Sequence, residues 1–160
     1  VEIPYRWTQQ LPDETVPSNA EVLPDLSGFG ILLAEDDPVN RRIASIYLSE
    51  LGVSVTLAPN GLEAIRLLRE SPSNYDLIFM DIRMPEMDGY SATRIIRDEL
   101  GVTEIPIIAM TAQVLPNELE NVTFSGMNDY LTKPINYKDL VNLLLKYLKP
   151  ASEKAGDIDC

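Results

Sequence analysis

Short apolar runs alternate with amphipathic segments along the chain from residue 30 onward. The runs are rich in β-branched residues and occupy residues 31–34, 53–57, 77–80, 105–109 and 130–132. Short strands separated by helical segments are typical of βα units around a parallel sheet. Because the runs are almost wholly apolar, we expect these strands to be buried on both faces of the sheet.

The segments between the apolar runs carry helix signals at their ends. Asp37 is a good N-cap, Pro38 suits the first helical position, and Gly52 ends the first helix. Further helices are expected over residues 60–69, 90–100 and 137–148, and after Pro116. The residues expected to face the core from the first three helices are Ile43, Ile46, Tyr47, Leu51, Leu62, Ile65, Leu68, Ile95 and Ile96.

Five strands joined by five helices predict an α/β fold with a single parallel sheet. Such strands need right-handed crossovers, and the common five-stranded solution is the doubly wound, flavodoxin-like strand order 2-1-3-4-5. The 160 residues, of which 45% are hydrophobic, suffice for one domain with a packed core. We expect this domain at residues 28–150, after a Pro-rich linker at 1–27 and before a tail at 151–160.

Charge and composition exclude several classes of function. The chain has 25 acidic and 13 basic residues and no histidine, a formal net charge of -12, which argues against direct nucleic-acid binding. No apolar run approaches the roughly 20 residues that span a bilayer, so we expect no membrane contact. The single cysteine, Cys160, excludes an internal disulfide and fits the cytoplasm. Chemistry must therefore depend on carboxylates, hydroxyls and a lysine.

Polar side chains follow four of the five predicted strands. Glu35 and Asp36 come after the first strand, Asp81 after the third, Thr111 after the fourth and Lys133 after the fifth. Ligand sites in open α/β sheets lie outside the carboxyl ends of the strands, where the strand order reverses. We therefore expect these five side chains to converge on one crevice.

The residue types in this crevice suit phosphoryl transfer. Crowded carboxylates repel one another unless a cation lies among them, and an oxygen-rich site with few protein ligands suits Mg²⁺, or Mn²⁺, with bound waters. An oxygen of the central Asp81 can then attack phosphorus in line and form an acyl phosphate. Lys133 supplies a charge and Thr111 a hydroxyl donor, and both stabilise negative charge on the transferred group.

Four segments around these residues are similar to the signatures of response regulator receiver domains. They are ILLAEDD at 31–37, FMDIRMPEMDG at 79–89, IIAMTA at 107–112 and YLTKPI at 130–135. The resemblance spans residues 28–150. It implies a domain that catalyses its own phosphorylation and dephosphorylation in a two-component phosphorelay.

The resemblance also implies a role for each residue of the crevice. Asp81 matches the phosphorylated aspartate, and Lys133 matches the lysine of the family, whose bond to Pro134 is expected to be cis. The implied metal ligands are Glu35, Asp36, Asp81 and the backbone carbonyl of Arg83. The implied switch residues are Thr111 and Tyr130. The alternative for Tyr130 is an ordinary half-buried aromatic residue on an edge strand.

The run EDDPVN at 35–40 resembles receivers of hybrid sensor histidine kinases more than free-standing regulators. This implies a partner that carries a phosphohistidine, either a kinase dimerisation domain or a histidine phosphotransfer protein. Residues 1–7 are consistent with the end of a preceding kinase domain. The alternatives are a stand-alone single-domain response regulator and an interaction scaffold that works without phosphorylation.

Two further hypotheses concern other functions of the same fold. An aspartyl-nucleophile hydrolase of the haloacid dehalogenase type would carry its nucleophile after the first strand, with a second aspartate two residues on, and EDDPVN fits this poorly. The fifth helix has more apolar residues than one core-facing stripe requires. Part of it is therefore expected either to be ordinarily buried or to form a dimer interface through helices 4 and 5.

Overall fold

The structure is a computed structural model, and it describes residues 24–148. Five parallel strands form one sheet in the order β2-β1-β3-β4-β5, as predicted. They are β1 (Gly30–Ala34), β2 (Ser54–Ala58), β3 (Leu77–Asp81), β4 (Ile107–Thr111) and β5 (Asp129–Thr132). The fourth strand begins two residues later than expected. The strand starts only after Pro106, because proline has no N–H to donate to the ladder. The Pro106 carbonyl still accepts a hydrogen bond from the Ile78 N–H.

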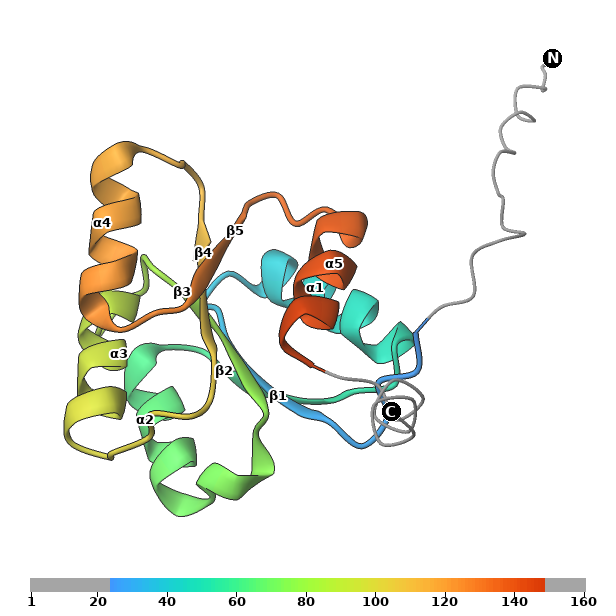
Figure 1. Ribbon diagram of the computed structural model, residues 1–160, viewed down its shortest axis with the longest axis horizontal. Helices are drawn as coiled ribbons and strands as arrows, with labels where there is room; N and C mark the ends of the chain where they lie inside the picture. The colour runs from blue at the N-terminus through green and yellow to red at the C-terminus, as the bar shows by residue number, and fades with distance from the viewer. Residues whose placement is uncertain (1–23, 149–160) are drawn as a thin grey trace, which may run out of the picture.

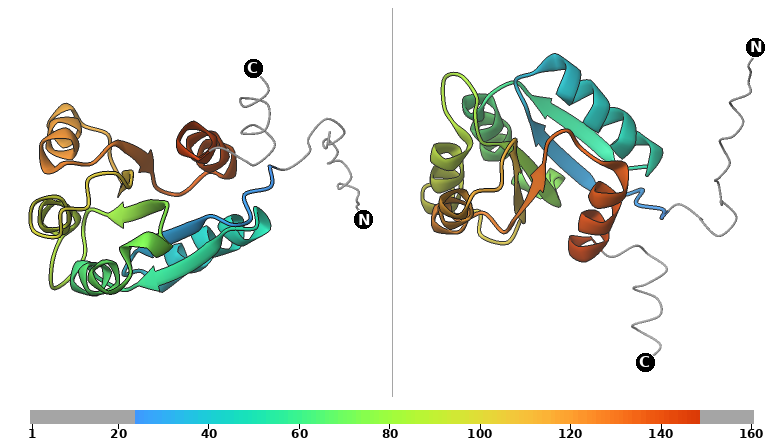
Figure 2. Two further views of the ribbon diagram at one scale, coloured as in Figure 1. Left: turned by 60° about the horizontal axis from the view of Figure 1, so that its bottom comes forward. Right: turned by 90° about the horizontal axis from the view of Figure 1, so that it is seen from above.

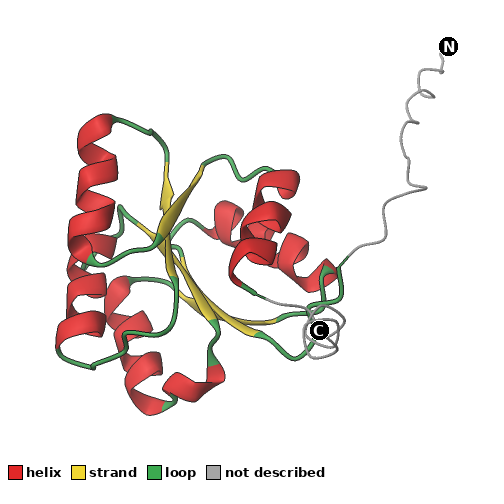
Figure 3. Ribbon diagram, in the orientation of Figure 1, coloured by secondary structure: helices red, strands yellow, loops and turns green. Residues whose placement is uncertain are grey.

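The helices lie on both faces of this sheet. They are α1 (Pro38–Glu50), α2 (Gly61–Glu70), α3 (Gly89–Asp98), α4 (Pro116–Ser125) and α5 (Tyr137–Tyr147). A short 3-10 helix, Pro72–Asn74, was not predicted. Figures 1 and 2 show α1 and α5 on one face and α2, α3 and α4 on the other, and Figure 3 separates helices from strands. Within residues 24–148, no helix is long and apolar enough to cross a membrane.

Side-chain caps explain where most of the helices begin. The Asp37 carboxylate accepts from the backbone N–H groups of Val39 and Asn40, so this residue caps α1 as predicted. Asparagine or aspartate side chains cap α2, α3 and α5 in the same way. The first turn of α4 has no such cap and starts with Pro116. The start of α4 therefore depends on other contacts.

Burial follows the position of each strand in the sheet. All residues of β1, β3 and β4 are buried, whereas the edge strands β2 and β5 are partly exposed. Two apolar clusters fill the spaces between the sheet and its helix layers. The prediction of burial on both faces is thus correct for the three inner strands and wrong for the two edges, where each strand has a neighbour on one side only.

Three of the residues expected to face the core are exposed instead. They are Ile43 and Ile46 of α1 and Leu62 of α2. In α1 the buried residues are Ala44, one position after Ile43, and Leu48, two positions after Ile46. Both sets satisfy a helical spacing, and the sequence alone does not distinguish them.

The packed domain begins before residue 28. Leu26 is fully buried in the cluster beneath α1 and α5, and its backbone N–H donates to the Leu51 carbonyl at 2.9 Å. Leu26 therefore belongs to the packed domain, although it lies within the range expected to be a linker. The other expectations for residues 1–23 and 149–160 lie outside the described residues.

We predict that Leu26→Ala lowers the free energy of unfolding by about 2–5 kcal/mol, because it leaves a cavity in the packed core. The matched control is Leu62→Ala, which truncates an exposed leucine and should cost less than about 0.5 kcal/mol. Urea unfolding of both variants measures the difference. Equal losses would contradict the assignment of Leu26 to the core.

Candidate functional site

The sheet brings the expected side chains to one edge. Glu35 follows β1, Asp81 ends β3, Thr111 ends β4 and Lys133 follows β5. Because β3 pairs with both β1 and β4, the ends of these strands lie side by side. Carboxylate oxygens of Glu35, Asp36 and Asp81 lie within 4.8 Å of one another. The convergence predicted from the sequence is therefore present in the fold.

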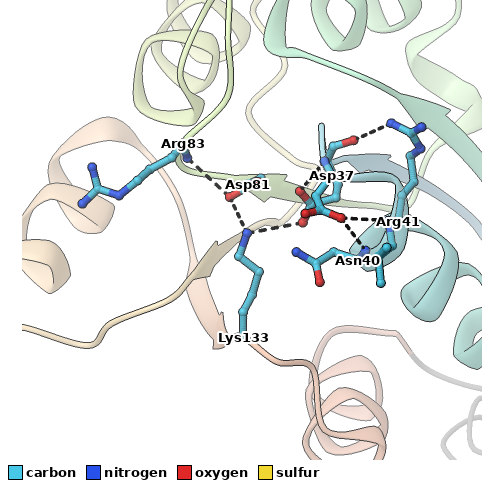
Figure 4. Close-up of polar contacts among 8 residues, drawn as sticks. Asp37, Asn40, Arg41, Asp81, Arg83 and Lys133 are labelled. Carbon is cyan, nitrogen blue, oxygen red and sulfur yellow. Dashed lines mark hydrogen bonds and ion pairs between the residues drawn. The ribbon is translucent and has the colours of Figure 1, made fainter.

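Lys133 joins the two most buried carboxylates of this cluster. Its Nζ lies 3.1 Å from Asp81 Oδ1 and 3.4 Å from Glu35 Oε2. Figure 4 shows the Lys133 side chain pointing toward Asp81. Asp81 is 2% exposed and Glu35 is 1% exposed. Burial alone lowers the pKa of Lys133, but the charge of Asp81, followed by that of Glu35, outweighs it, and the pKa is raised. The lysine is therefore charged at neutral pH. Its bond to Pro134 is cis, as expected.

Glu35 is the carboxylate whose ionisation is hardest to maintain. Burial, followed by the neighbouring Asp81, raises its pKa to about 7, although the Asp37 N–H and Lys133 act in the opposite direction. One lysine thus does not compensate three crowded acidic groups. A hard divalent cation would complete the compensation, and a set of carboxylate oxygens is the donor chemistry that such a cation prefers.

The loop after β3 sets the position of Asp81. The Arg83 N–H donates to Asp81 Oδ1 at 3.3 Å, and the Gly89 N–H closes the loop by donating to the Ile82 carbonyl at 2.8 Å. A Cβ at Gly89 would lie only 2.4 Å from the Asp81 carbonyl oxygen, so no larger residue fits there. The glycine lets α3 start against the strand and brings the Arg83 backbone beside the carboxylate.

Thr111 and Tyr130 occupy different positions relative to the carboxylates. The Thr111 hydroxyl donates to the Gln113 carbonyl at 2.6 Å, and Thr111 borders a small cavity together with Asp81 and Lys133. Tyr130 is exposed and lines a surface groove with Val114. The structure therefore brings Thr111 to the site but not the Tyr130 ring.

Two residues at the site were missed by the sequence analysis. The Arg41 guanidinium donates to the backbone carbonyl of Glu35 at 3.0 Å, and Glu118 of α4 pairs with Arg83 at 3.3 Å. Arg41 lies one turn into α1 from the Asp37 cap, a spacing that could have indicated it. Nothing in the sequence connects Glu118 to Arg83, because the contact spans 35 positions.

The chain belongs to the response regulator receiver domain family, whose family model matches residues 31–145. Transcription factor SKN7 of Saccharomyces cerevisiae is 43% identical over 122 residues, which cover 76% of this chain and 19% of that protein. Sensor histidine kinase GacS of Pseudomonas protegens is 35% identical over 154 residues, which cover 94% of this chain and 16% of that protein. The chain thus spans less than a fifth of either relative.

Solved receiver domains have the same architecture. The receiver domain of sensor histidine kinase PA1611 from Pseudomonas aeruginosa, which holds a magnesium ion in its active-site cleft, is 45% identical with a TM-score of 0.68, covering 76% of this chain and 98% of that one. The receiver domain of Ssk1 from Saccharomyces cerevisiae, solved with the histidine phosphotransfer protein Ypd1, is 31% identical with a TM-score of 0.70, covering 79% and 91%.

We predict that the affinity of this carboxylate cluster for a divalent cation falls about tenfold between pH 8 and pH 6. A proton on Glu35 competes with the cation, and with a pKa of about 7 the carboxyl is mostly ionised at the higher pH and mostly protonated at the lower. Isothermal titration calorimetry at the two pH values measures the change. The control is Glu63→Gln, which removes a carboxylate on α2 away from the cluster and should leave the pH dependence of the affinity unchanged. An affinity independent of pH would contradict the competition between a proton and the cation at Glu35.

Proposed function

We propose that this domain is the phosphoacceptor of a two-component phosphorelay, in which Asp81 accepts a phosphoryl group from a phosphohistidine. The observation that carries this proposal is the contact of Lys133 with the buried Asp81 and Glu35. A buried nucleophilic carboxylate beside a lysine and a hydroxyl is suited to binding a group that arrives with negative charge.

In the proposed reaction, Asp81 attacks phosphorus in line. A bond forms between its carboxylate oxygen and phosphorus as the phosphorus–nitrogen bond of the phosphohistidine breaks. Lys133 remains charged and binds one phosphoryl oxygen, and the Thr111 hydroxyl binds another after it leaves the Gln113 carbonyl. The small cavity that these residues border lies where the transferred group would be held.

We further propose that the cation of the site is Mg²⁺, or Mn²⁺ in its place. Its proposed protein ligands are Glu35, Asp36, Asp81 and the backbone carbonyl of Arg83. When bound, the cation supplies the positive charge that offsets the carboxylates and the incoming phosphoryl group. The magnesium ion in the cleft of the PA1611 receiver domain supports this assignment.

The proposed output is a conformational switch through Thr111 and Tyr130. Movement of the Thr111 hydroxyl toward the phosphoryl group breaks its bond to Gln113 and frees the loop that leads into α4. Tyr130, exposed in the present conformation, then rotates inward. Phosphorylation acts by favouring one of two conformations that already exist, typically by a few kcal/mol.

We infer that the domain, which we place at residues 28–150 together with Leu26, belongs to a hybrid sensor histidine kinase in the cytoplasm. The alignment with GacS covers 94% of the chain and so extends beyond residues 24–148, whereas that with SKN7 covers 76%. The proposed partners are a kinase dimerisation domain or a histidine phosphotransfer protein, as the Ssk1–Ypd1 complex suggests. A stand-alone response regulator remains the alternative. A phosphorylation-independent scaffold would need none of the chemical groups that are present.

We predict that phosphoramidate or acetyl phosphate with Mg²⁺ adds one phosphoryl group to the chain, because these small donors replace phosphohistidine. Asp81→Asn should abolish the gain, and a chelator should prevent it in the wild type. Intact-mass spectrometry measures the result. The control is Asp98→Asn, which changes an exposed aspartate of α3 and should leave the gain intact. An unmodified wild type would favour the scaffold.

We propose a dimer through α4 and α5 and predict that Phe124→Ser weakens it. Phe124 and Leu119 are exposed apolar residues of α4, and exposed apolar surface favours association. Sedimentation of the phosphorylated chain measures the dimer. Leu62→Ser on α2 is the matched control, and a wild type that is monomeric at all concentrations would refute the dimer.

A further inference from the structure

Glu118 joins three elements beside the phosphoacceptor site. One of its carboxylate oxygens accepts a hydrogen bond from the Tyr90 hydroxyl of α3 at 2.6 Å. The other pairs with the Arg83 guanidinium, from the loop after β3, at 3.3 Å. The Glu118 side chain is 15% exposed, whereas that of Arg83 is 80% exposed. Glu118 is therefore the fixed member of the pair and Arg83 the movable one.

Tyr90 keeps the Glu118 carboxylate in place. Burial, followed by the hydrogen bond to Glu118, raises the pKa of Tyr90, so its hydroxyl remains a donor throughout the neutral range. Glu118 also lies in the first turn of α4, where a carboxylate is favoured by the helix dipole and where no side-chain cap is present. These contacts hold the acidic partner of Arg83 independently of Arg83 itself.

Arg83 is close to the position that a phosphoryl group would take. Its backbone N–H donates to Asp81 Oδ1, and the residue lines the small cavity that Thr111 and Lys133 also border. Figure 4 shows its side chain extending away from Asp81. A phosphoryl group adds about two negative charges and good acceptors for a guanidinium. An exposed pair with one carboxylate is weak in comparison.

We propose that Glu118 is a positioning residue of the phosphoacceptor site, which holds the Arg83 guanidinium away from Asp81 until phosphorylation draws Arg83 onto the phosphoryl group. The inference rests on the proposed function and extends it to the lifetime of the phosphorylated state. It concerns the Arg83 side chain and is separate from the backbone carbonyl proposed as a metal ligand.

The chemical consequence is slower loss of the phosphoryl group. In hydrolysis, a water oxygen bonds to phosphorus as the bond between phosphorus and the Asp81 oxygen breaks. Inorganic phosphate and the free carboxylate are formed, and one proton passes to solvent. Water must approach in line from the open side of the site. A guanidinium paired with the phosphoryl oxygens covers that side and obstructs the approach.

The test is the half-life of the phosphorylated chain in the presence of Mg²⁺, followed by intact mass after phosphoramidate is removed. Arg83→Ala should shorten the half-life about two- to fivefold, the effect of one exposed charge pair. Glu118→Gln should lengthen it by a similar factor, because Arg83 is no longer held back. Tyr90→Phe should act in the same direction as Glu118→Gln. Glu120→Gln, an exposed neighbour on α4, is the matched control and should have no effect.

The double variant separates positioning from a structural effect. In the Arg83→Ala background, Glu118→Gln should no longer change the half-life, because its effect passes through Arg83. An unchanged effect in that background, or a normal half-life for Arg83→Ala, would overturn the role of Glu118 while phosphorylation itself remained intact. A wild-type chain that takes up no phosphoryl group would overturn the proposed function, and this inference with it.

Discussion

Electrostatic repulsion among three acidic side chains at the ends of β1 and β3 is the constraint on which this site depends. Glu35 and Asp81 are almost completely buried, and burial strengthens their repulsion because little water remains to screen them. Lys133 lies between the two and offsets part of this cost. The negative charge that Lys133 leaves uncompensated is the basis for the cation that we propose at this site.

The parallel sheet creates this arrangement, because strands β1, β3, β4 and β5 all end at the same edge. The inner strands are buried between apolar clusters on both faces of the sheet. Their ends place the polar groups of the site, and the loops that follow them carry further contacts. The loop after β4 carries the Thr111–Gln113 contact, and the loop after β3 carries Arg83.

The helix layer that contains α3 and α4 connects these loops to the surface of the domain. Glu118 is a contact between that layer and the loop after β3, and it lies in the first turn of α4, which has no side-chain cap. In the mechanism that we propose, a change of charge at Asp81 reaches α4 by two routes, one through Thr111 and one through Arg83. Both routes depend on hydrogen bonds at or near the surface, which break at little cost.

The sequence by itself determined the elements, the strand order and the five polar groups at the strand ends. Short apolar strands in βα units admit few topologies, and the ends of parallel strands must meet at one edge. It also indicated the Asp37 cap, because that signal lies within a few adjacent residues.

Only the tertiary structure decided which face of α1 is buried, how much of each edge strand is exposed, and that Leu26 belongs to the core. It alone brought Glu118 to Arg83. These features depend on helix rotation and on contacts between residues far apart in the chain. Local periodicity does not encode them, because two faces of one helix can satisfy the same spacing and only packing selects between them.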